Sequence, residues 1–454
     1  MKTKRLLALL LTTIMVLGLM TGCGAKKAEP STVNTENGEE AAEITNLTVW
    51  YWGEQEIPGY QQYMEEMAEK YAAENPNFTV EVVLQDSDTL YSALRTAEAA
   101  GEGPDCAFLW GGTQALEDVW LGNLDPISDY MTAEELAIMD DSALAESNWN
   151  DKQWGWPAYS VCFGLAYNKE MFKNAGLDPE NPPKTWDEFL AACEALKNAG
   201  YIPIGTGIKD GYLPGWLAVY FGGQNYDDPN DAIKPFRLEE DYTDMQCAQW
   251  VYLVKDLIDA GYFNNDVQSL DLYQGQQLLE TESCAMTFQC GPYTQTIANN
   301  MGEDKIGFMQ APVFGDGELA KAVSVGQQVY VIPKSAQHKD EVCDFLIFLA
   351  RDDNLARMVE LTNAWVPTKA FDPATIDGAI IQNVASWMKN QRLYNYQYTY
   401  PMNWENESLA PIMQRMFTDG LSAEDAVKEL QDGITKWAEQ NPNVLDAYKI
   451  WVVK

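Results

Sequence analysis

Between residues 47 and 82, a strand pattern, a helix pattern and a second strand pattern follow one another. Apolar side chains alternate over 47–51 and again over 78–82, which is typical of β-strands. Between them, after Pro58 and up to Pro76, large side chains recur at helical spacing: Tyr60, Met64, Met67 and Tyr71. A strand–helix–strand unit of this spacing predicts parallel strands.

The rest of the chain continues to alternate between helix and strand patterns. Thr185 and Glu188 form a capping box at the start of a predicted helix, and Ser422 opens a late one. A further amphipathic helix is predicted over 340–351, and a strand over 329–333 lies between helices. The predicted fold class is therefore α/β throughout, without internal repeats.

The first 22 residues predict a signal peptide. Basic residues precede an apolar run over 6–20, which is shorter than the ~20 residues that a membrane-spanning helix needs. The following Thr21-Gly22-Cys23-Gly24 resembles the lipobox of bacterial lipoproteins, although Met20 stands where that family usually has Leu. The resemblance implies lipidation at Cys23 and anchoring to the cell membrane of a bacterium. An ordinary signal peptide with an incidental Cys is the alternative.

Residues 23–43 predict a flexible tether, because they hold no large apolar side chain that would offset the entropy of ordering. The remaining ~410 residues are too many for one hydrophobic core and predict two lobes. Without the signal peptide the chain has 27 basic and 68 acidic residues, a net charge of −41. Such a charge disfavours nucleic acid as a partner and suits solubility outside the cell.

The cysteines do not predict a disulfide framework, because seven remain after Cys23 and most lie in apolar stretches typical of buried thiols. A single disulfide between Cys284 and Cys290 is the alternative prediction. No CxxC pair indicates a metal, and we expect neither metal nor cofactor.

No catalytic constellation is evident, so we expect a protein that is not an enzyme. The single histidine, His338, lies at a predicted helix start, where an exposed residue is usual, so a His-dependent triad lacks a member. The glycines of 205–211 have the wrong spacing for a dinucleotide fingerprint. An exported glycoside hydrolase remains an alternative because the 68 acidic residues make paired carboxylates common, and an interaction module is a third class.

Five stretches resemble, in the right order, the extracellular solute-binding proteins of ABC importers, the maltose-binding-like family 1. They are GEGPD (101–105), WGWPAYSVCFGLAYNKEMF with PPKTWDEF (154–189), CAMTFQCGPY (284–293), SAQHKDEVCDFLIFL (335–349) and LSAEDAVKEL (421–430). The resemblance implies a periplasmic-binding-protein-like fold, in which two α/β lobes joined by a hinge enclose a ligand cleft. It places lobe 1 at 44–157 plus 316–368 and lobe 2 at 158–315 plus 369–454. The implied partners are a carbohydrate ligand and the permease of an ABC transporter, and we expect a monomer.

The aromatic stretch WYWG at 50–53 fits such a cleft. A flat, rigid ring stacks on the C–H face of a sugar while neighbouring polar groups bind its hydroxyls. We expect Trp52 to stack on ligand and Glu54 and Gln55 to bind hydroxyls, whereas Trp50 is expected to pack in the core.

The resemblance marks further cleft positions, with core packing as the alternative for each aromatic residue. They are Trp110, Gly112, Thr113, Tyr212, Trp216, Tyr293 (in place of the family's Trp), Asn403 and Trp404. The alternating tyrosines of 394–400 lie just before the last two. None of the cleft segments contains Lys or Arg, so we expect a neutral glycan rather than an anionic one. A peptide or a polyamine is the alternative ligand.

Overall fold

The computed structural model describes residues 44–87 and 89–453. The predicted signal peptide, the lipidation site at Cys23 and the tether therefore lie outside the described residues. Within these residues, no helix combines the length and the apolar character needed to cross a membrane.

The predicted strand–helix–strand unit is present at the start of the fold. Strand β1 (Thr45–Tyr51) pairs in parallel with β2 (Phe78–Leu84), with Leu47 opposite Val80. Helix α2 (Tyr60–Glu74) connects them and buries the four residues of its predicted apolar stripe. The alternation over 45–51 is real, because Leu47, Val49 and Tyr51 are buried.

One mixed sheet runs through the molecule in the order β2-β1-β3-β11-β7-β9-β8, with β4 beside β11 and β10 beside β7. The bounds of these further strands are β3 (Cys106–Trp110), β4 (Leu124–Asp125), β7 (Gly155–Asn168), β8 (Ile204–Gly205), β9 (Met286–Cys290), β10 (Ile306–Met309) and β11 (Val325–Pro333). A separate hairpin consists of β5 (Asn148–Trp149) and β6 (Lys152–Gln153). The predicted strand over 329–333 is the second half of β11.

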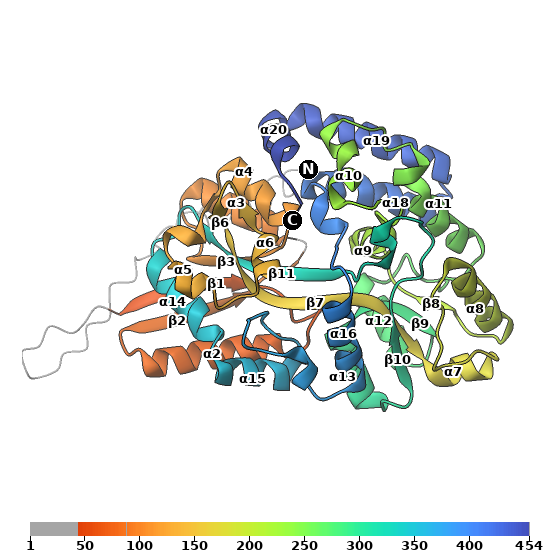
Figure 1. Cartoon of the computed structure of the whole chain (residues 1–454), viewed down its shortest axis with the longest axis horizontal. Coiled ribbons are helices and arrows are strands. Elements are labelled where there is room, and N and C mark those ends of the chain that lie inside the picture. The colour runs from red at the N-terminus through yellow and green to blue at the C-terminus, as the bar shows by residue number, and fades with distance from the viewer. Residues whose placement is uncertain (1–43, 88, 454) are drawn as a thin grey trace, which may run out of the picture.

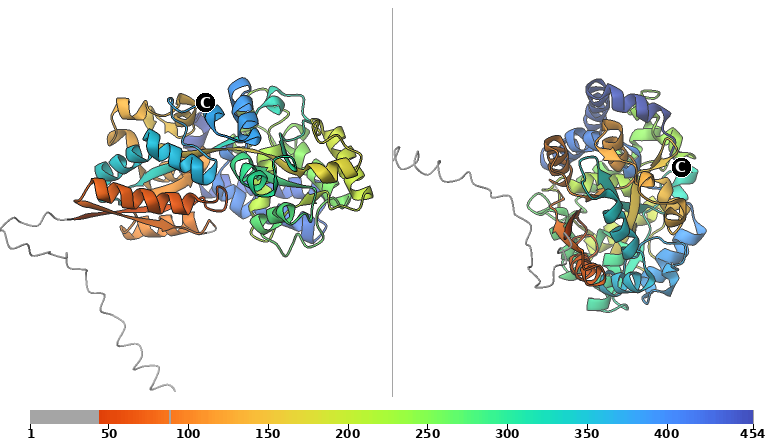
Figure 2. Two further views of the ribbon diagram at one scale, coloured as in Figure 1. Left: turned by 90° about the horizontal axis from the view of Figure 1, so that it is seen from below. Right: turned by 90° about the vertical axis from the view of Figure 1, so that its left-hand side faces the viewer.

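Strand β7 connects the two lobes, because its pairing partner changes along its length. Residues 155–162 pair with β11, and residues 163–167 pair with β9. In Figure 1, β7 and β11 cross the middle of the molecule, with α2 to α6 on one side and α7, α8 and α12 on the other. The two groups also stay side by side when the molecule is seen from below (Figure 2). The lobe boundary predicted between residues 157 and 158 falls inside the part of β7 that still pairs with β11.

Helices cover the sheet in both lobes of the molecule. Around lobe 1 lie α2, α3 (Leu90–Ala100), α4 (Thr113–Leu121), α5 (Ala133–Leu136), α6 (Asp141–Ala145), α14 (Lys339–Leu349) and α15 (Asp352–Thr362). Around lobe 2 lie α7 (Lys169–Asn174), α8 (Trp186–Asn198), α9 (Tyr212–Phe221), α10 (Pro229–Ala232), α11 (Met245–Asp259), α12 (Leu272–Glu280), α13 (Gly291–Met301) and α16 (Ala379–Asn390). The predicted capping box at Thr185 and Glu188 is confirmed at the start of α8.

The C-terminal part of the chain packs on both lobes. It comprises α17 (Met402–Trp404), α18 (Ala410–Thr418), α19 (Ala423–Gln440) and α20 (Pro442–Ile450). Helix α19 contacts α11, and α20 contacts α4. The Ser422 hydroxyl accepts a hydrogen bond from the backbone of Asp425 at the start of α19, as predicted.

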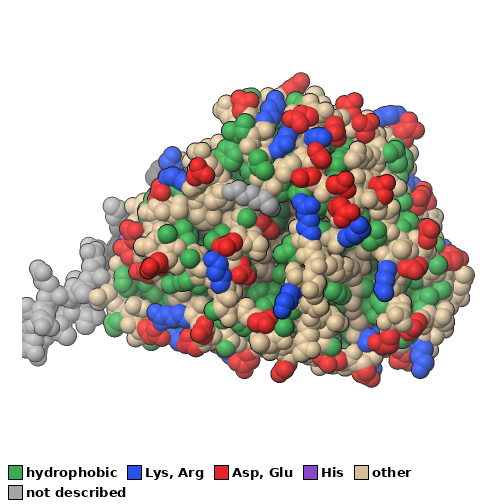
Figure 3. All heavy atoms as spheres, in the orientation of Figure 1, with side chains coloured by type: hydrophobic (Ala, Val, Ile, Leu, Met, Phe, Trp, Pro, Cys, Tyr) green, Lys and Arg blue, Asp and Glu red, His purple; other side chains and the backbone are tan. Residues whose placement is uncertain are grey.

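The cysteines of the described chain are buried and free. Cys290 is the last residue of β9, and Cys284 lies two residues before its first. The extended backbone of the strand keeps the two thiols apart. The open possibility of a disulfide between them is therefore wrong, and the expectation of buried thiols is confirmed. The acidic side chains are spread over the face seen in Figure 3 rather than gathered in one patch, which fits a general role in solubility.

Candidate ligand-binding site

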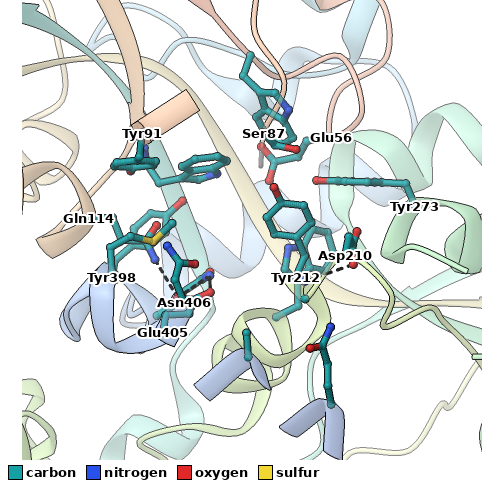
Figure 4. Close-up of a pocket in the computed structure, with 18 of the residues that line it drawn as sticks. Glu56, Ser87, Tyr91, Gln114, Asp210, Tyr212, Tyr273, Tyr398, Glu405 and Asn406 are labelled. Atoms are coloured by element: carbon teal, nitrogen blue, oxygen red, sulfur yellow. Dashed lines mark hydrogen bonds between the residues drawn. The ribbon is translucent and has the colours of Figure 1, made fainter. Parts of the chain in front are cut away.

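A cavity with a volume of about 560 Å³, called here the main cavity, lies between the lobes. Lobe 1 contributes Trp52 and Trp110, at the ends of β1 and β3, and lobe 2 contributes Trp216 and Tyr273. The C-terminal segment adds Tyr398. In Figure 4, Gln114 and Tyr398 lie on one side of a gap, and Tyr273, Tyr212 and Asp210 lie on the other. A molecule held here would touch both lobes.

Aromatic rings form the walls of this cavity and pack on one another. The ring centroids of Trp52 and Trp110 are 5.2 Å apart, and Tyr91 stacks on Trp110 at 5.5 Å. Across the gap, Trp216 contacts Phe163 at 5.2 Å and Tyr273 at 6.5 Å. The rings are thus fixed before a ligand arrives, which lowers the entropy lost on binding.

Four of the predicted ligand-binding residues line this cavity: Trp52, Trp110, Tyr212 and Trp216. Trp52 is only 3% exposed, and its ring packs on Phe108 and Tyr273. It therefore belongs to the core and lines the cavity at the same time. Trp50 is half-buried at the surface of the core.

Glu54 and Gln55 line a smaller neighbouring hollow, which shares Trp52 and Ser87 with the main cavity. The Glu54 carboxylate accepts hydrogen bonds from the backbone of Gly59 and Gln61 at 3.1 and 2.7 Å. It therefore stabilises the positive N-terminal end of α2.

Gly112 and Thr113 lie outside the main cavity but position one of its walls. The Thr113 hydroxyl donates to the backbone carbonyls of Tyr398 and Tyr400 at 3.0 and 2.7 Å. Gly112 has φ of +60°, and a Cβ there would lie 2.2 Å from the carbonyl oxygen of Tyr398. The backbone of Tyr398 therefore packs against a position where only glycine fits.

Three other predicted residues are placed away from this cavity. The Tyr293 hydroxyl donates to Glu280, and the Asn403 amide donates to Glu117. Trp404 is 1% exposed, and its indole N–H donates to the carbonyl of Leu430. The neighbouring Met402 lines the cavity instead.

The structure brings three carboxyl groups to the cavity that the sequence reasoning missed. Glu56 accepts hydrogen bonds from the Tyr159 hydroxyl at 2.8 Å and the Gln328 amide at 3.1 Å, and burial raises its pKa to about 7. The only sequence signal was its place two residues beyond Glu54. The backbone N–H groups of Glu56 and Ile57 both donate to Gly53, and this turn brings Glu56 inward.

Asp210 and Glu405 are the other two carboxyl groups, and neither was itself predicted, although Asp210 lies two residues before Tyr212 and Glu405 follows Trp404 directly. Burial raises the pKa of Asp210 to about 6 and that of Glu405 to about 7. Gln114 and Gln397 donate to Glu405, which begins a π-helical turn (Glu405–Leu409); such turns are frequent at functional sites. Lys209 also lines the cavity, so basic residues are not absent from it as the cleft segments suggested.

This arrangement suits binding of a polar molecule that has an apolar face. The rings present flat apolar surfaces, and the carboxyl and amide groups among them accept or donate hydrogen bonds. In the described part of the chain, no group of His, Cys, Asp and Glu side chains is arranged to hold a metal ion.

Comparison with known families identifies what kind of protein has this cavity. The model of the bacterial extracellular solute-binding proteins matches residues 54–356. The chain belongs to this family. Among its relatives is the sn-glycerol-3-phosphate-binding periplasmic protein of Shigella flexneri, which is 24% identical over 363 residues, covering 73% of this chain and 76% of the relative.

Solved structures of solute-binding proteins share the fold of this family member. A chitin oligosaccharide binding protein superposes with a TM-score of 0.76 at 21% identity, covering 87% of this chain and 98% of that one. An ABC transporter solute-binding protein from Thermotoga lettingae, bound with α-D-tagatose, gives a TM-score of 0.72 at 21% identity, over 86% of this chain and 99% of that one. The periplasmic-binding-protein-like fold is therefore shown.

Proposed function

We propose that this solute-binding protein captures a neutral carbohydrate, an oligosaccharide, in the cavity between its lobes. The observation that carries the proposal is the set of aromatic rings that both lobes place around the cavity, Trp52 and Trp110 from lobe 1 and Trp216 and Tyr273 from lobe 2. Carboxyl and amide groups between them match a ring of hydroxyls around an apolar sugar face. The sugar-binding proteins that share the fold support this ligand class.

The captured sugar is then delivered to the permease of an ABC importer. The protein is held near that permease by lipid on Cys23, and it works as a monomer without catalysis. The lobes, at about 44–157 plus 316–368 and 158–315 plus 369–454, close around the ligand by bending where β7 and the other connections cross.

A polyamine is the second candidate, because Glu56, Asp210 and Glu405 line the cavity against one basic residue, Lys209. Buried carboxylates without a cation are unfavourable, and an ammonium group would stabilise them. We rank it second because linear polyamines offer no broad face for four aromatic rings.

A thermal-shift screen tests the proposed ligand class. A ligand that binds only the folded state stabilises it by about 2.7 kcal/mol at a hundredfold excess over Kd, which raises Tm by several degrees. We expect this rise for a narrow group of neutral oligosaccharides, and a smaller one for the matching uronates. A rise with spermidine alone would support the second candidate, and a rise with glycerol 3-phosphate or uronates alone would overturn the neutral assignment.

A further inference from the structure

The three carboxyl groups of the main cavity differ in how many oxygens the protein itself already pairs. Both oxygens of Asp210 accept backbone N–H groups, at 3.3 and 3.0 Å. The two oxygens of Glu405 accept from Gln397 at 3.0 Å and from Gln114 at 3.1 Å. These two carboxyl groups therefore hold the walls of the cavity in place, and Glu56 is the one to consider as a contact to ligand.

Glu56 keeps one oxygen for the cavity. Its Oε2 accepts from both the Tyr159 hydroxyl and the Gln328 amide, which lie on β7 and β11, the two strands that cross between the lobes. Within the described part of the chain Oε1 has no hydrogen-bond partner, and it stays accessible from the cavity although the residue is only 3% exposed. Because buried polar groups almost always have a partner, the partner of Oε1 must come from the cavity.

Tyr273 presents a second free group from the other lobe. It lies on α12, and its ring lines the cavity and packs on Trp52, with 6.4 Å between ring centroids. Its hydroxyl is accessible and has no hydrogen-bond partner among the described residues. Burial and the nearby Glu56 carboxyl raise the pKa of Tyr273 well above its usual range, so the hydroxyl keeps its proton and can donate. In Figure 4 this hydroxyl points into the gap beside Glu56.

One ligand hydroxyl can pair with both groups, because a hydroxyl donates one hydrogen bond and accepts two. Burial raises the pKa of Glu56 to about 7, so near neutral pH its carboxyl occurs in both forms. An ionised Oε1 accepts from the ligand hydroxyl, and a protonated Oε1 donates to it. Tyr273 donates to the same hydroxyl in either case, whereas a ligand carboxylate would repel the ionised form of Glu56.

We propose that Glu56 and Tyr273 bind a single ligand hydroxyl between them and thereby select a sugar that carries a hydroxyl at this point. The two residues belong to different lobes, so the shared hydroxyl also links the lobes in the liganded protein. This inference rests on the proposed function, because it takes the occupant of the main cavity to be a carbohydrate.

Calorimetric titration of wild type, Tyr273→Phe, Glu56→Gln and the double variant tests the shared contact. The probes are maltotriose, cellotriose, xylotriose and raffinose. Tyr273→Phe keeps the ring and removes only the hydroxyl, so it should weaken binding about tenfold, the usual effect of losing a hydrogen bond in a charged network. Tyr252→Phe is the matched control, because Tyr252 lies on α11 outside the cavity, and it should bind like wild type.

Glu56→Gln should weaken binding severalfold. The amide oxygen of the new side chain can still accept from Tyr159 and Gln328, which turns its NH₂ group toward the cavity in place of an acceptor. The double variant should lose less affinity than the product of the two single losses, because both substitutions act on the same ligand hydroxyl. A melting curve of each variant shows that it is folded.

Two results would overturn this inference while leaving the proposed function intact. One is wild-type affinity in Tyr273→Phe, which would mean that its hydroxyl does not contact the sugar. The other is a double variant whose loss equals the product of the single losses, which would mean that the two residues bind separate groups. Failure of all four probes to bind wild type is a distinct result, because it contradicts the proposed ligand class, and this inference then falls with it.

Discussion

Buried carboxyl groups around the main cavity make the stability of the unliganded protein depend on pH. Burial raises the pKa of Glu56 to about 7 from an ordinary value near 4.5. Between these two values the folded state holds a proton that the unfolded state has released, so stability falls as pH rises. The shift corresponds to about 3 kcal/mol for Glu56, and Asp210 and Glu405 act in the same direction.

We therefore expect Tm of the unliganded protein to fall from pH 5 to pH 8, and Glu56→Gln to make this fall smaller. Glu69→Gln is the matched control, because Glu69 is an exposed glutamate on α2. Melting curves in buffers of equal ionic strength check the prediction. Equal slopes for wild type and Glu56→Gln would show that Glu56 is already ionised in the folded state.

Single residues show which parts of the site the sequence pattern predicts and which parts it does not. Trp52 was predicted to meet ligand, and it does line the cavity, yet its contacts with Phe108 and Tyr273 come from segments far apart in sequence. The resemblance points to Glu54, which falls where the family's ligand-contacting polar residues lie, and not to Glu56. The turn at Gly53 reverses this choice, and its hydrogen bonds carry no signal in a pattern of residue types.

At the scale of elements, the junction of β3 and α4 positions the segment that contains Tyr398. Gly112 and Gly122, which flank α4, both have positive φ, at +60° and +80°. A Cβ on Gly112 would meet the carbonyl oxygen of Tyr398 at 2.2 Å, whereas a Cβ on Gly122 would meet nothing within 4 Å. Gly122 has an ordinary left-handed conformation (ψ 23°), whereas Gly112 combines close packing with a backbone conformation (ψ −141°) that is essentially confined to glycine.

We expect Gly122→Ala to lower the free energy of unfolding by about 1–2 kcal/mol, the usual cost of a left-handed conformation. Gly112→Ala should lower it by a further ~1–3 kcal/mol because Tyr398 must move, and it should also weaken ligand binding. Denaturant unfolding and ligand titration of both variants measure these effects. Equal losses in the two variants would contradict the role given to Gly112.

Elements with local signals were predictable, and those held by distant contacts were not. The capping box of α8, the Ser422 cap of α19 and the apolar stripe of α2 depend on residues a few positions apart, and the structure confirms them. The alternating tyrosines over 394–400 lie just before the predicted cleft residues Asn403 and Trp404. The segment contains a short 3₁₀ turn (Gln397–Thr399), and Tyr396 and Tyr400 are buried on either side of it, because Thr113 fixes the backbone from α4.

At the scale of the whole molecule, five motifs in order indicated the two-lobed fold correctly. The cavity itself requires both lobes and the C-terminal segment, so its acidic residues are far apart in sequence at positions 56, 210 and 405. No local pattern brings these positions together. The C-terminal helices also contact both lobes. The contact between α20 and α4 therefore opposes any closing movement of the lobes.

Anchoring to a membrane is a proposed property of the whole molecule, implied by the resemblance of Thr21-Gly22-Cys23-Gly24 to a lipobox. We expect wild type to fractionate with membranes and to carry acyl chains on Cys23, since two or more chains give stable anchoring. Cys23→Ala should be released or wrongly processed. Mass spectrometry of the wild-type N-terminus decides this, and an unmodified Cys23 in the membrane fraction would contradict the prediction.

The central claim is that a carbohydrate binds between the aromatic walls of the main cavity. Its most direct measurement is calorimetric titration of Trp110→Ala and Trp154→Ala with the sugar that raises Tm of wild type most. Both indoles are half-buried in lobe 1, but only Trp110 lines the cavity. We predict that Trp110→Ala weakens binding by about 1–3 kcal/mol, as expected for a lost stacking ring, while Trp154→Ala binds like wild type. Equal affinities for the three proteins would contradict the claim, as would the absence of any sugar that binds.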